Sequence, residues 1–397
     1  MAISKAVREG LGAASWIRRM FEAGIRMKAE RGEENVFDFS LGNPDLPPPQ
    51  AFVERLRAVV ADERPGVHRY MPNVGFEETR RAVATYLASE TGVAFGADQI
   101  VMCVGAAGGI NLAMNVLLDP GDEVITLTPY FVEYGFYIRN FQAVNVEVDT
   151  DEAFLPDIDA LAAAITARTK LVIINFPNNP SGRVCPADRL NELARVLDEA
   201  SKRHGNPIYL LSDEPYRNIC FDGVELPSPA AAYRNTLTVT SHSKDLSLPG
   251  ERIGCVAVNP EADEAADIVR GAAFCSRTLG YVNAPALMQR VVATLQGVTV
   301  DVGVYQRRRD LLTAGLARIG YEFVMPEGAF YLFPRAPGGD DLAFTKLLVE
   351  QGVLCVPGRG FRRPGYFRIS YAAPDELIRR SLPAFERAFQ ASEGRTT

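Results

Sequence analysis

Residues 171–182 read Leu-Val-Ile-Ile-Asn-Phe-Pro-Asn-Asn-Pro-Ser-Gly, and this stretch decides the fold class. It opens with a run of apolar, largely β-branched residues that shows no alternation with polar ones, which indicates a strand buried on both faces. Pro177 and Pro180 then end the strand, because proline has no N–H to donate to a sheet ladder. A short strand of this kind is typical of a parallel sheet covered by helices on both sides.

Similar apolar runs recur along the chain, with helix-length segments between most of them, at residues 100–104, 123–127, 144–148, 208–212, 236–240 and 254–258. This pattern predicts an α/β fold whose large domain has three layers around a mostly parallel seven-stranded sheet.

The last hundred residues combine helical patterns with short strand-like runs instead of the repeated buried strands seen before them, which predicts a smaller α+β domain. We expect helices near 305–319 and 342–351 and short strands near 322–324, 330–334, 353–356 and 366–371. We further expect residues 1–50 to complete this small domain, residues 51–295 to form the large domain, and residues 296–397 to form the rest of the small one.

Composition excludes several classes of protein. The net charge of -7 argues against nucleic-acid and anionic-membrane partners. No apolar run approaches the roughly 18 residues that span a bilayer, and the N-terminus lacks the apolar segment of a signal peptide. The six cysteines and three histidines are scattered without ligand spacing, which argues against disulfides and a zinc site. We therefore expect a cytoplasmic protein without a bound metal.

The segments that follow five predicted strands carry the chemically informative residues. They are Gly105-Ala-Ala-Gly-Gly109, Thr128-Pro-Tyr-Phe131, Pro177-Asn-Asn-Pro-Ser-Gly182, Asp213-Glu-Pro-Tyr216 and Ser241-His-Ser-Lys244. Ligands of parallel α/β sheets bind beyond the carboxyl ends of the strands, so these segments predict one shared site.

Three of these segments have clear chemical meanings. The Gly- and Ala-rich turn at 105–109 would offer backbone N–H groups to an anion such as phosphate. Lys244, with Arg252 nearby in sequence, would have a lowered pKa and react with carbonyl groups. Asp213 ends an apolar strand and needs a cationic partner, such as a protonated ring nitrogen. Each also has an ordinary interpretation: a tight turn, a surface lysine and a helix cap.

Taken in order, these motifs resemble those of the fold-type I, class I/II aminotransferases, which bind pyridoxal 5′-phosphate (PLP). The matching motifs are Asn178-Asn-Pro-Ser-Gly182, Asp213-Glu-Pro-Tyr216, Ser241-His-Ser-Lys244 with Arg252, Phe367-Arg-Ile-Ser370, Leu41-Gly-Asn-Pro44, Tyr70 and Leu118-Asp-Pro-Gly-Asp122. The resemblance covers nearly the whole chain and implies the PLP-dependent transferase fold of type I.

The resemblance implies a role for each residue that would hold the cofactor ring. Lys244 would bind the cofactor as a Schiff base and carry a proton between the substrate Cα and the cofactor C4′. Asp213 would pair with the ring nitrogen, and Tyr216 and Asn179 would bind the ring oxygen. Phe131 would stack on the ring.

It also implies a phosphate site and a substrate site. The phosphate would be held by the amides of Ala106 and Ala107, by Ser241 and Ser243, and by Arg252. Arg368 would clamp the substrate α-carboxylate with two hydrogen bonds, and Gly42 would let the N-terminal segment close over the substrate. Tyr70 would reach the phosphate of a neighbouring subunit, which implies a homodimer with shared sites.

The expected reaction moves the amino group of an L-amino acid to a 2-oxo acid such as 2-oxoglutarate. Aspartate, alanine and aromatic amino acids are the expected donors. No lysine occurs in residues 105–110, where one branch of the aspartate aminotransferases carries one. Arg277 could bind a distal carboxylate, bind the neighbour's phosphate or form a structural ion pair, while Phe21, Tyr130 and Tyr331 either line the side-chain pocket or pack elsewhere.

Two other functions are compatible with parts of this pattern. A carbon–sulfur β-lyase has the same fold, but a histidine is expected there in place of Tyr216. A ligand sensor without activity would carry a DNA-binding domain ahead of Leu41, and the residues before Leu41 do not resemble one.

Overall fold

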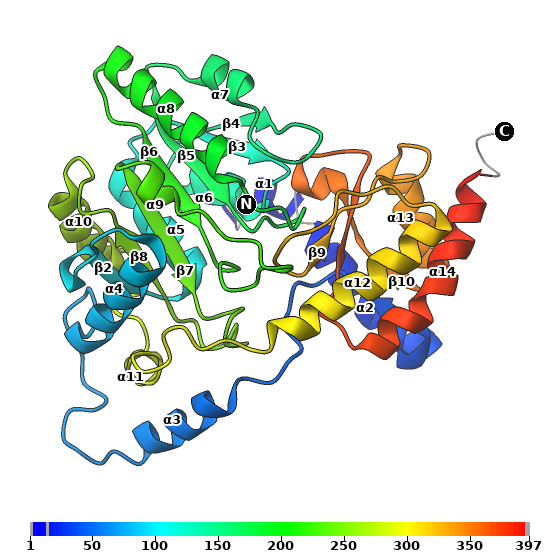
Figure 1. Ribbon diagram of the computed structural model, residues 1–397, viewed down its shortest axis with the longest axis horizontal. Helices are drawn as coiled ribbons and strands as arrows, with labels where there is room; N and C mark the ends of the chain where they lie inside the picture. The colour runs from blue at the N-terminus through cyan, green and yellow to red at the C-terminus, as the bar shows by residue number, and fades with distance from the viewer. Residues whose placement is uncertain (1–2, 13–15, 394–397) are drawn as a thin grey trace.

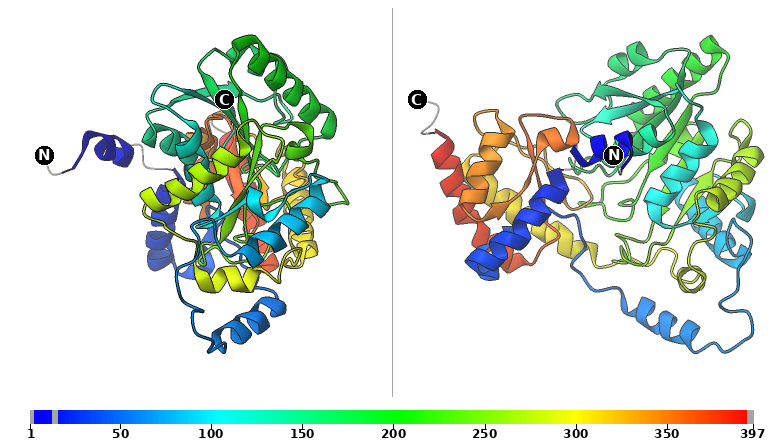
Figure 2. Two further views of the ribbon diagram at one scale, coloured as in Figure 1. Left: turned by 90° about the vertical axis from the view of Figure 1, so that its left-hand side faces the viewer. Right: turned by 180° about the vertical axis from the view of Figure 1, so that it is seen from behind.

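The structure is a computed structural model that describes residues 3–12 and 16–393. A large sheet with its covering helices forms one part of the molecule, and a smaller helix-rich part lies beside it (Figure 1). Rotated views show that helix α2 (Trp16–Arg31) lies along the smaller part, while α1 (Lys5–Gly12) reaches toward the large part, where Gly10 lies close to Arg139 (Figure 2).

The large sheet has seven strands in the order β2-β8-β7-β6-β5-β3-β4. Their bounds are β2 Ile100–Cys103, β3 Glu123–Thr128, β4 Val144–Asp149, β5 Thr169–Asn175, β6 Tyr209–Asp213, β7 Thr236–Ser241 and β8 Gly254–Val258. Strand β8 runs antiparallel to both of its neighbours, and the other pairs are parallel. The prediction of a mostly parallel seven-stranded sheet is confirmed.

Helices cover both faces of this sheet because successive strand side chains point to opposite sides. One face packs against α5 (Gly105–Leu117), α6 (Glu133–Asn140) and α10 (Ala265–Thr278). The other packs against α7 (Ile158–Ala164), α8 (Ala187–His204), α9 (Pro229–Ala232), α4 (Glu77–Thr91) and α11 (Ala286–Val292). Helix α3 (Gln50–Val60) lies outside this layer and packs on α11. The 3₁₀ turn η2 (Ala97–Gln99) leads into β2.

The smaller part contains three helices and short strands. The helices are α12 (Val302–Ile319), α13 (Asp341–Glu350) and α14 (Asp375–Glu393), and the strands are β9 (Tyr331–Leu332), β10 (Val353–Leu354), β11 (Val356–Pro357) and β12 (Phe367–Ser370), with the 3₁₀ turns η1 (Glu33–Asn35) and η3 (Gly358–Phe361) nearby. Strand β1 (Phe37–Asp38) pairs in parallel with β10. This pairing is the contact expected if residues 1–50 complete the small domain, and the division at residues 50 and 295 remains a prediction.

One predicted strand is wrong. Residues 322–324 form no strand, although Arg335 N donates a hydrogen bond to Glu322 O at 2.9 Å and the Arg335 and Glu322 side chains form an ion pair at 3.8 Å. Pro326, which has no N–H, follows closely and prevents a longer ladder.

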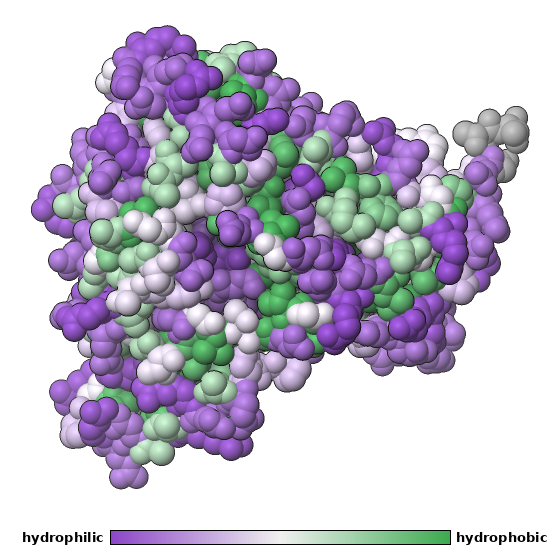
Figure 3. Space-filling view, viewed as in Figure 1, coloured by the Kyte–Doolittle hydropathy of each residue, from purple (hydrophilic) through white to green (hydrophobic). Residues whose placement is uncertain are grey.

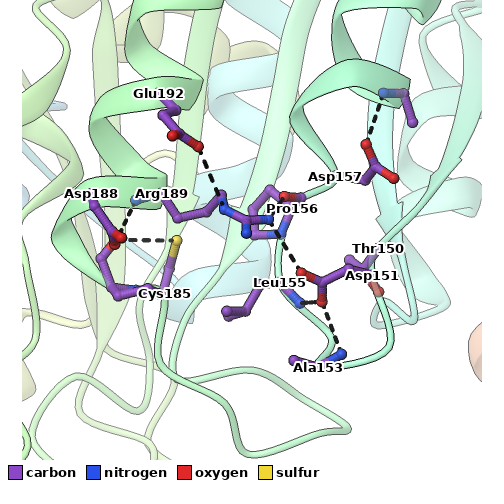
Figure 4. A network of polar contacts seen from close by, with 12 residues as sticks. Thr150, Asp151, Ala153, Leu155, Pro156, Asp157, Cys185, Asp188, Arg189 and Glu192 are labelled. Carbon is purple, nitrogen blue, oxygen red and sulfur yellow. Dashed lines mark hydrogen bonds and ion pairs between the residues drawn. The ribbon is translucent and has the colours of Figure 1, made fainter.

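The loop between β4 and α7 is tied to helix α8 through Arg189 (Figure 4). The Arg189 guanidinium donates to Pro156 O at 2.5 Å and to Asp151 Oδ2 at 3.2 Å. The other oxygen of Asp151 accepts from the N–H groups of Ala153 and Leu155, both at 2.9 Å. This network fixes the loop at the edge strand β4, away from the ends of the central strands.

The face in Figure 3 is mostly hydrophilic, and hydrophobic residues come to the surface chiefly where the two parts meet. None of the helices within the described ranges is both long and apolar enough to cross a membrane.

Candidate active site

A cavity of about 260 Å³ lies where the carboxyl ends of β5, β6 and β7 meet the smaller part. Of the residues expected to hold the cofactor, to bind the substrate α-carboxylate or to let the chain close over the substrate, all but Tyr70 line it. The lining residues are Gly42, Ala106, Ala107, Ile110, Phe131, Asn175, Asn179, Asp213, Pro215, Tyr216, Ser241, Ser243, Lys244, Pro249, Arg252, Tyr331 and Arg368. The cavity joins residues from both ends of the chain, because Gly42, Tyr331 and Arg368 come from outside the large sheet.

Lys244 follows strand β7 and points into this cavity. Its Nζ donates to Gly42 O at 2.8 Å and lies 5.7 Å from the centre of the Tyr216 ring. Burial, with the nearby cations Arg368 and Arg252, lowers the pKa of Lys244 to about 8, while Asp213 acts in the opposite direction. A substantial fraction of this amine is therefore neutral near pH 8, as a nucleophile or a base requires.

Asp213 is the last residue of β6 and is only 5 % exposed. Its Oδ2 accepts a hydrogen bond from the Tyr134 hydroxyl at 2.5 Å, and Asn175 Nδ2 donates to its main-chain oxygen at 2.7 Å. Its Oδ1 has no partner within the described residues. Burial is the main reason that the pKa of Asp213 is raised to about 7. One buried carboxylate oxygen is thus left for a donor from a ligand.

Tyr134 was missed by the sequence analysis. It lies in α6, is almost fully buried, and its ring stacks on Tyr130 with the centroids 6.1 Å apart. Its position three residues after Phe131, one helical turn along, was the available signal. The sequence could not show that this turn faces the end of β6.

Backbone N–H groups, hydroxyls and a guanidinium converge at the opposite side of the cavity. Ala106 and Ala107 lie in the first turn of α5, whose N–H groups have no partner within the helix. Ser241 Oγ donates to Ser243 Oγ at 3.1 Å, and Arg252 donates to Pro249 O at 2.8 Å. Gly105 has a φ of +74°, and a Cβ there would lie 2.5 Å from the Arg252 guanidinium. These groups form a site suited to a phosphate.

Arg368 of β12 is 2 % exposed, yet no carboxylate pairs with it within the described residues. It donates to Asn179 Oδ1 at 2.9 Å and to Ser40 O at 2.6 Å. Its guanidinium lies 4.6 Å from the centre of the Tyr331 ring, and its Nε has no hydrogen-bond partner in the described part of the chain. Burial lowers the pKa of Arg368. A cation held in this way is suited to receiving an anion from outside.

The Tyr216 and Tyr331 hydroxyls are hydrogen-bonded to each other at 2.7 Å. Gly42 packs directly against the Tyr331 hydroxyl, and a Cβ at residue 42 would overlap that oxygen. Glycine is required at this position by close approach rather than by an unusual φ.

Three other candidates, Tyr70, Arg277 and Tyr130, do not line the cavity, and the side chain of a fourth, Phe21, is not among those described. Tyr70 is 88 % exposed. The Arg277 guanidinium lies 5.4 Å from the centre of the Phe274 ring on α10. Tyr130 donates to Glu147 at 2.7 Å and does not line the cavity, and the side chain of Phe21 is outside the described residues. The roles predicted for Tyr70 and Arg277 stay predictions.

Comparisons with known proteins agree with this geometry. The family model for aminotransferase class I and II matches residues 34–384. The aspartate/prephenate aminotransferase of Thermus thermophilus is 35% identical over 368 residues, which cover 91% of this chain and 93% of that protein. The aromatic-amino-acid aminotransferase 2 of Thermococcus litoralis is 31% identical, over 95% of this chain and 96% of that one. A crystal structure of an aminotransferase from Eubacterium rectale superposes with a TM-score of 0.95 at 42% identity, and covers 98% of this chain and 99% of its own.

Proposed function

The chain belongs to the class I and II aminotransferases, and from that membership we propose how its cavity moves an amino group from an L-amino acid to a 2-oxo acid. The enzyme uses pyridoxal 5′-phosphate, as this family does. The observation that carries the proposal is the convergence of Lys244, Asp213 and Arg368 in one cavity, with each charge left without an opposite charge bonded to it.

The cavity fits the cofactor in the chemistry of its donors. When bound, PLP supplies a reactive aldehyde carbon and a conjugated ring that accepts the electron pair left on the substrate Cα. The unpartnered Oδ1 of Asp213 would accept from the ring N–H, which would keep this carboxylate ionised. Phe131 would flank the ring, and Asn179 and Tyr216 would bind the ring oxygen.

The phosphate would occupy the site at the start of α5. The N–H groups of Ala106 and Ala107, the hydroxyls of Ser241 and Ser243, and the Arg252 guanidinium would hold it. A dianion at a helix N-terminus beside one arginine is favoured by the helix dipole and by charge-assisted hydrogen bonds.

Lys244 would anchor the cofactor covalently and then act as the general base. Once the substrate amine has displaced it, the freed Lys244 amine would take the proton from the substrate Cα and deliver it to the cofactor. Its lowered pKa, about 8, keeps enough of the amine neutral for both tasks. Its present acceptor, Gly42 O, lies at the edge of the cavity and can be exchanged for these partners.

Arg368 would bind the α-carboxylate of the substrate. Its two terminal nitrogens now donate to Asn179 and to Ser40, and a carboxylate is a stronger acceptor than either neutral oxygen. Because the clamp fixes one end of the substrate, the Cα–H bond is held in reach of Lys244. Gly42, which packs beside Tyr331, would close the cavity on that side.

The exposed Tyr70 supports a homodimer in which Tyr70 reaches the phosphate of the other subunit. Mixing two inactive variants, Tyr70→Phe and Lys244→Ala, tests it, because a shared site restores activity in one of the two cavities of a mixed dimer. No recovery after dissociation and remixing would contradict the shared site. All six cysteines are unpaired, which supports a cytoplasmic location.

The donors we propose are aspartate, alanine and aromatic amino acids. One relative is named for aspartate and prephenate and another for aromatic amino acids. Ile110, Phe131 and Tyr331 give the cavity an apolar wall that suits aromatic and small side chains. Tyr216, where a β-lyase is expected to carry histidine, favours transamination.

The test exposes the PLP-loaded protein to single L-amino acids without any acceptor. A donor is identified when the visible band of the cofactor disappears and an equivalent amount of 2-oxo acid is released, while the D-enantiomer serves as the control. Pyruvate and ammonia from a cysteine conjugate, with the visible band unchanged, would identify a lyase. Absence of any visible band after PLP is added would contradict the role of Lys244.

A further inference from the structure

The two phenols at the bottom of the cavity, Tyr216 and Tyr331, have no hydrogen-bond partner in the described chain except each other. Both are buried, and their rings meet edge to face at 82° with centroids 5.6 Å apart. They lie 115 residues apart in sequence. The pair therefore joins the large sheet to the smaller part at the floor of the site.

A count of protons shows that one hydroxyl hydrogen of this pair has no protein acceptor. Each phenol has one proton, and one hydrogen bond uses only one of the two. If Tyr216 donates to Tyr331, nothing remains on Tyr216 to offer a ligand. If Tyr331 donates to Tyr216, the Tyr216 proton is free to point into the cavity.

The position of Arg368 favours the second arrangement. Its guanidinium lies 4.6 Å from the centre of the Tyr331 ring, and a cation over the face of a phenol makes its O–H more acidic. Burial raises the pKa of both phenols, that of Tyr216 well above its usual value, while the Arg368 charge opposes the rise for both and is the largest opposing cause for Tyr331. The more acidic phenol is the better donor.

We propose that Tyr331 is a positioning residue for amino transfer: its hydroxyl donates to the Tyr216 oxygen, so that the Tyr216 proton is presented to the ring oxygen of the bound cofactor. The inference rests on the proposed function, because it needs Tyr216 to face that cofactor. Gly42 has a part in it, since only a residue without a Cβ leaves room for the Tyr331 hydroxyl.

The same arrangement links the carboxylate clamp to the cofactor. A substrate carboxylate on Arg368 offsets the positive charge over the Tyr331 ring and makes Tyr331 a weaker donor. Tyr216 then becomes a weaker donor in turn. Binding of a carboxylate is thus felt at the cofactor's ring oxygen through two hydroxyl groups, with no movement of the backbone.

A spectroscopic pH titration of the PLP-loaded protein tests this. Without the Tyr331 hydroxyl, Tyr216 stabilises the negative charge on the ring oxygen less well, and the cofactor keeps its proton to higher pH. We expect Tyr331→Phe to raise the pH midpoint of the visible band by roughly half to one unit, the size of one neutral hydrogen bond. We expect kcat to fall about five-fold with little change in KM, since the ring beneath Arg368 remains.

A double-mutant cycle separates this role from packing. If Tyr331 acts through Tyr216, Tyr331→Phe shifts the midpoint in the wild-type protein and adds nothing in a Tyr216→Phe background. Tyr371→Phe is the matched control, because Tyr371 is equally buried near Tyr331 and its hydroxyl has no partner in the described chain. We expect this control to leave the midpoint unchanged.

Carboxylates without an amino or oxo group provide a second readout. Succinate or 3-phenylpropionate should move the midpoint of the wild-type band, and the move should shrink in Tyr331→Phe. An unchanged midpoint in folded Tyr331→Phe, or an equal shift with and without Tyr216, would overturn the role of Tyr331 and leave the proposed function intact. A wild-type protein with no visible band would overturn both.

Discussion

Arg309 and Arg368 are both almost fully buried, at 4 % and 2 % exposure, but the protein treats their charges in opposite ways. Arg309 of α12 donates to both oxygens of Asp222, at 2.6 and 3.1 Å, and to Asp310 at 2.9 Å. Among the residues that the structure describes, Arg368 donates only to the neutral oxygens of Asn179 and Ser40. Correspondingly, the two carboxylates raise the pKa of Arg309 despite its burial, whereas burial lowers the pKa of Arg368.

Two adjacent carboxylates at the end of β6 repeat this contrast. Glu214 is 2 % exposed and pairs with Arg217, and it also accepts from the Ser212 hydroxyl at 2.7 Å. Asp213 has one oxygen without a partner among the described residues, and burial raises its pKa to about 7. Burying an uncompensated charge costs free energy, so a residue of this kind persists where a ligand supplies the missing partner.

The largest expected effect concerns Lys244, the third charge that the protein leaves without an ionic partner. Lys244→Ala should abolish the visible band and lower kcat by at least about a thousandfold, because it removes the covalent anchor and the general base together. Absorption spectroscopy and steady-state kinetics measure both. Lys170→Ala, on β5 beside Tyr209, is the control and should behave as the wild type. Full activity in Lys244→Ala would contradict the idea that buried charges without an ionic partner mark the active site.

Asp213 predicts a stability effect in the protein without cofactor. Its pKa is about 3.8 in the unfolded chain and about 7 in the folded one, so the folded state holds more protons between these values. The stability of the cofactor-free protein should therefore fall as pH rises from about 4 to about 7 and then level off, a loss of up to roughly 4 kcal/mol.

The variant Asp213→Asn should lack this pH dependence. At pH 8 it should be more stable than the wild type without cofactor, and it should bind PLP more weakly because a neutral amide cannot form an ion pair with the protonated ring nitrogen. Urea unfolding at several pH values, with and without PLP, measures both. If the two proteins showed the same dependence of stability on pH, the Asp213 carboxylate would have to be stabilised by partners within the protein.

The sequence was sufficient for the features that depend on local pattern. Apolar runs located the seven strands of the large sheet within about two residues, and the residues after them line the cavity. Contacts between segments that are distant in the sequence could not be predicted from it. Neither the Tyr134 bond to Asp213, across 79 residues, nor the pairing of Tyr216 with Tyr331 leaves a local signal. The wrong strand at 322–324 is another such case, since no strand among the described residues pairs with this segment.

Arg368→Gln tests whether the buried arginine without a carboxylate partner binds the substrate. We expect KM for the amino donor to rise on the order of a hundredfold, since a charge-assisted carboxylate contact is lost. We expect no loss of stability in thermal unfolding, because no carboxylate is left unpaired. Arg368→Lys should recover only part of the affinity, as an ammonium cannot form the two parallel bonds of a guanidinium. A KM within threefold of the wild type would place the substrate carboxylate elsewhere.

Arg309→Gln tests the buried arginine that is paired with carboxylates, and we expect it to lower stability without changing substrate binding. Removing this guanidinium leaves Asp222 and Asp310 without their partner and breaks its bond to Pro326 O at 3.2 Å. Both carboxylates are about half exposed, so water recovers part of their solvation, and we expect a loss of about 2 kcal/mol rather than the full cost of a buried unpaired charge. KM and kcat of the folded variant should stay within about twofold of the wild type. If Arg309→Gln instead raised KM while stability held, burial with full pairing would no longer distinguish a structural arginine from one that binds substrate.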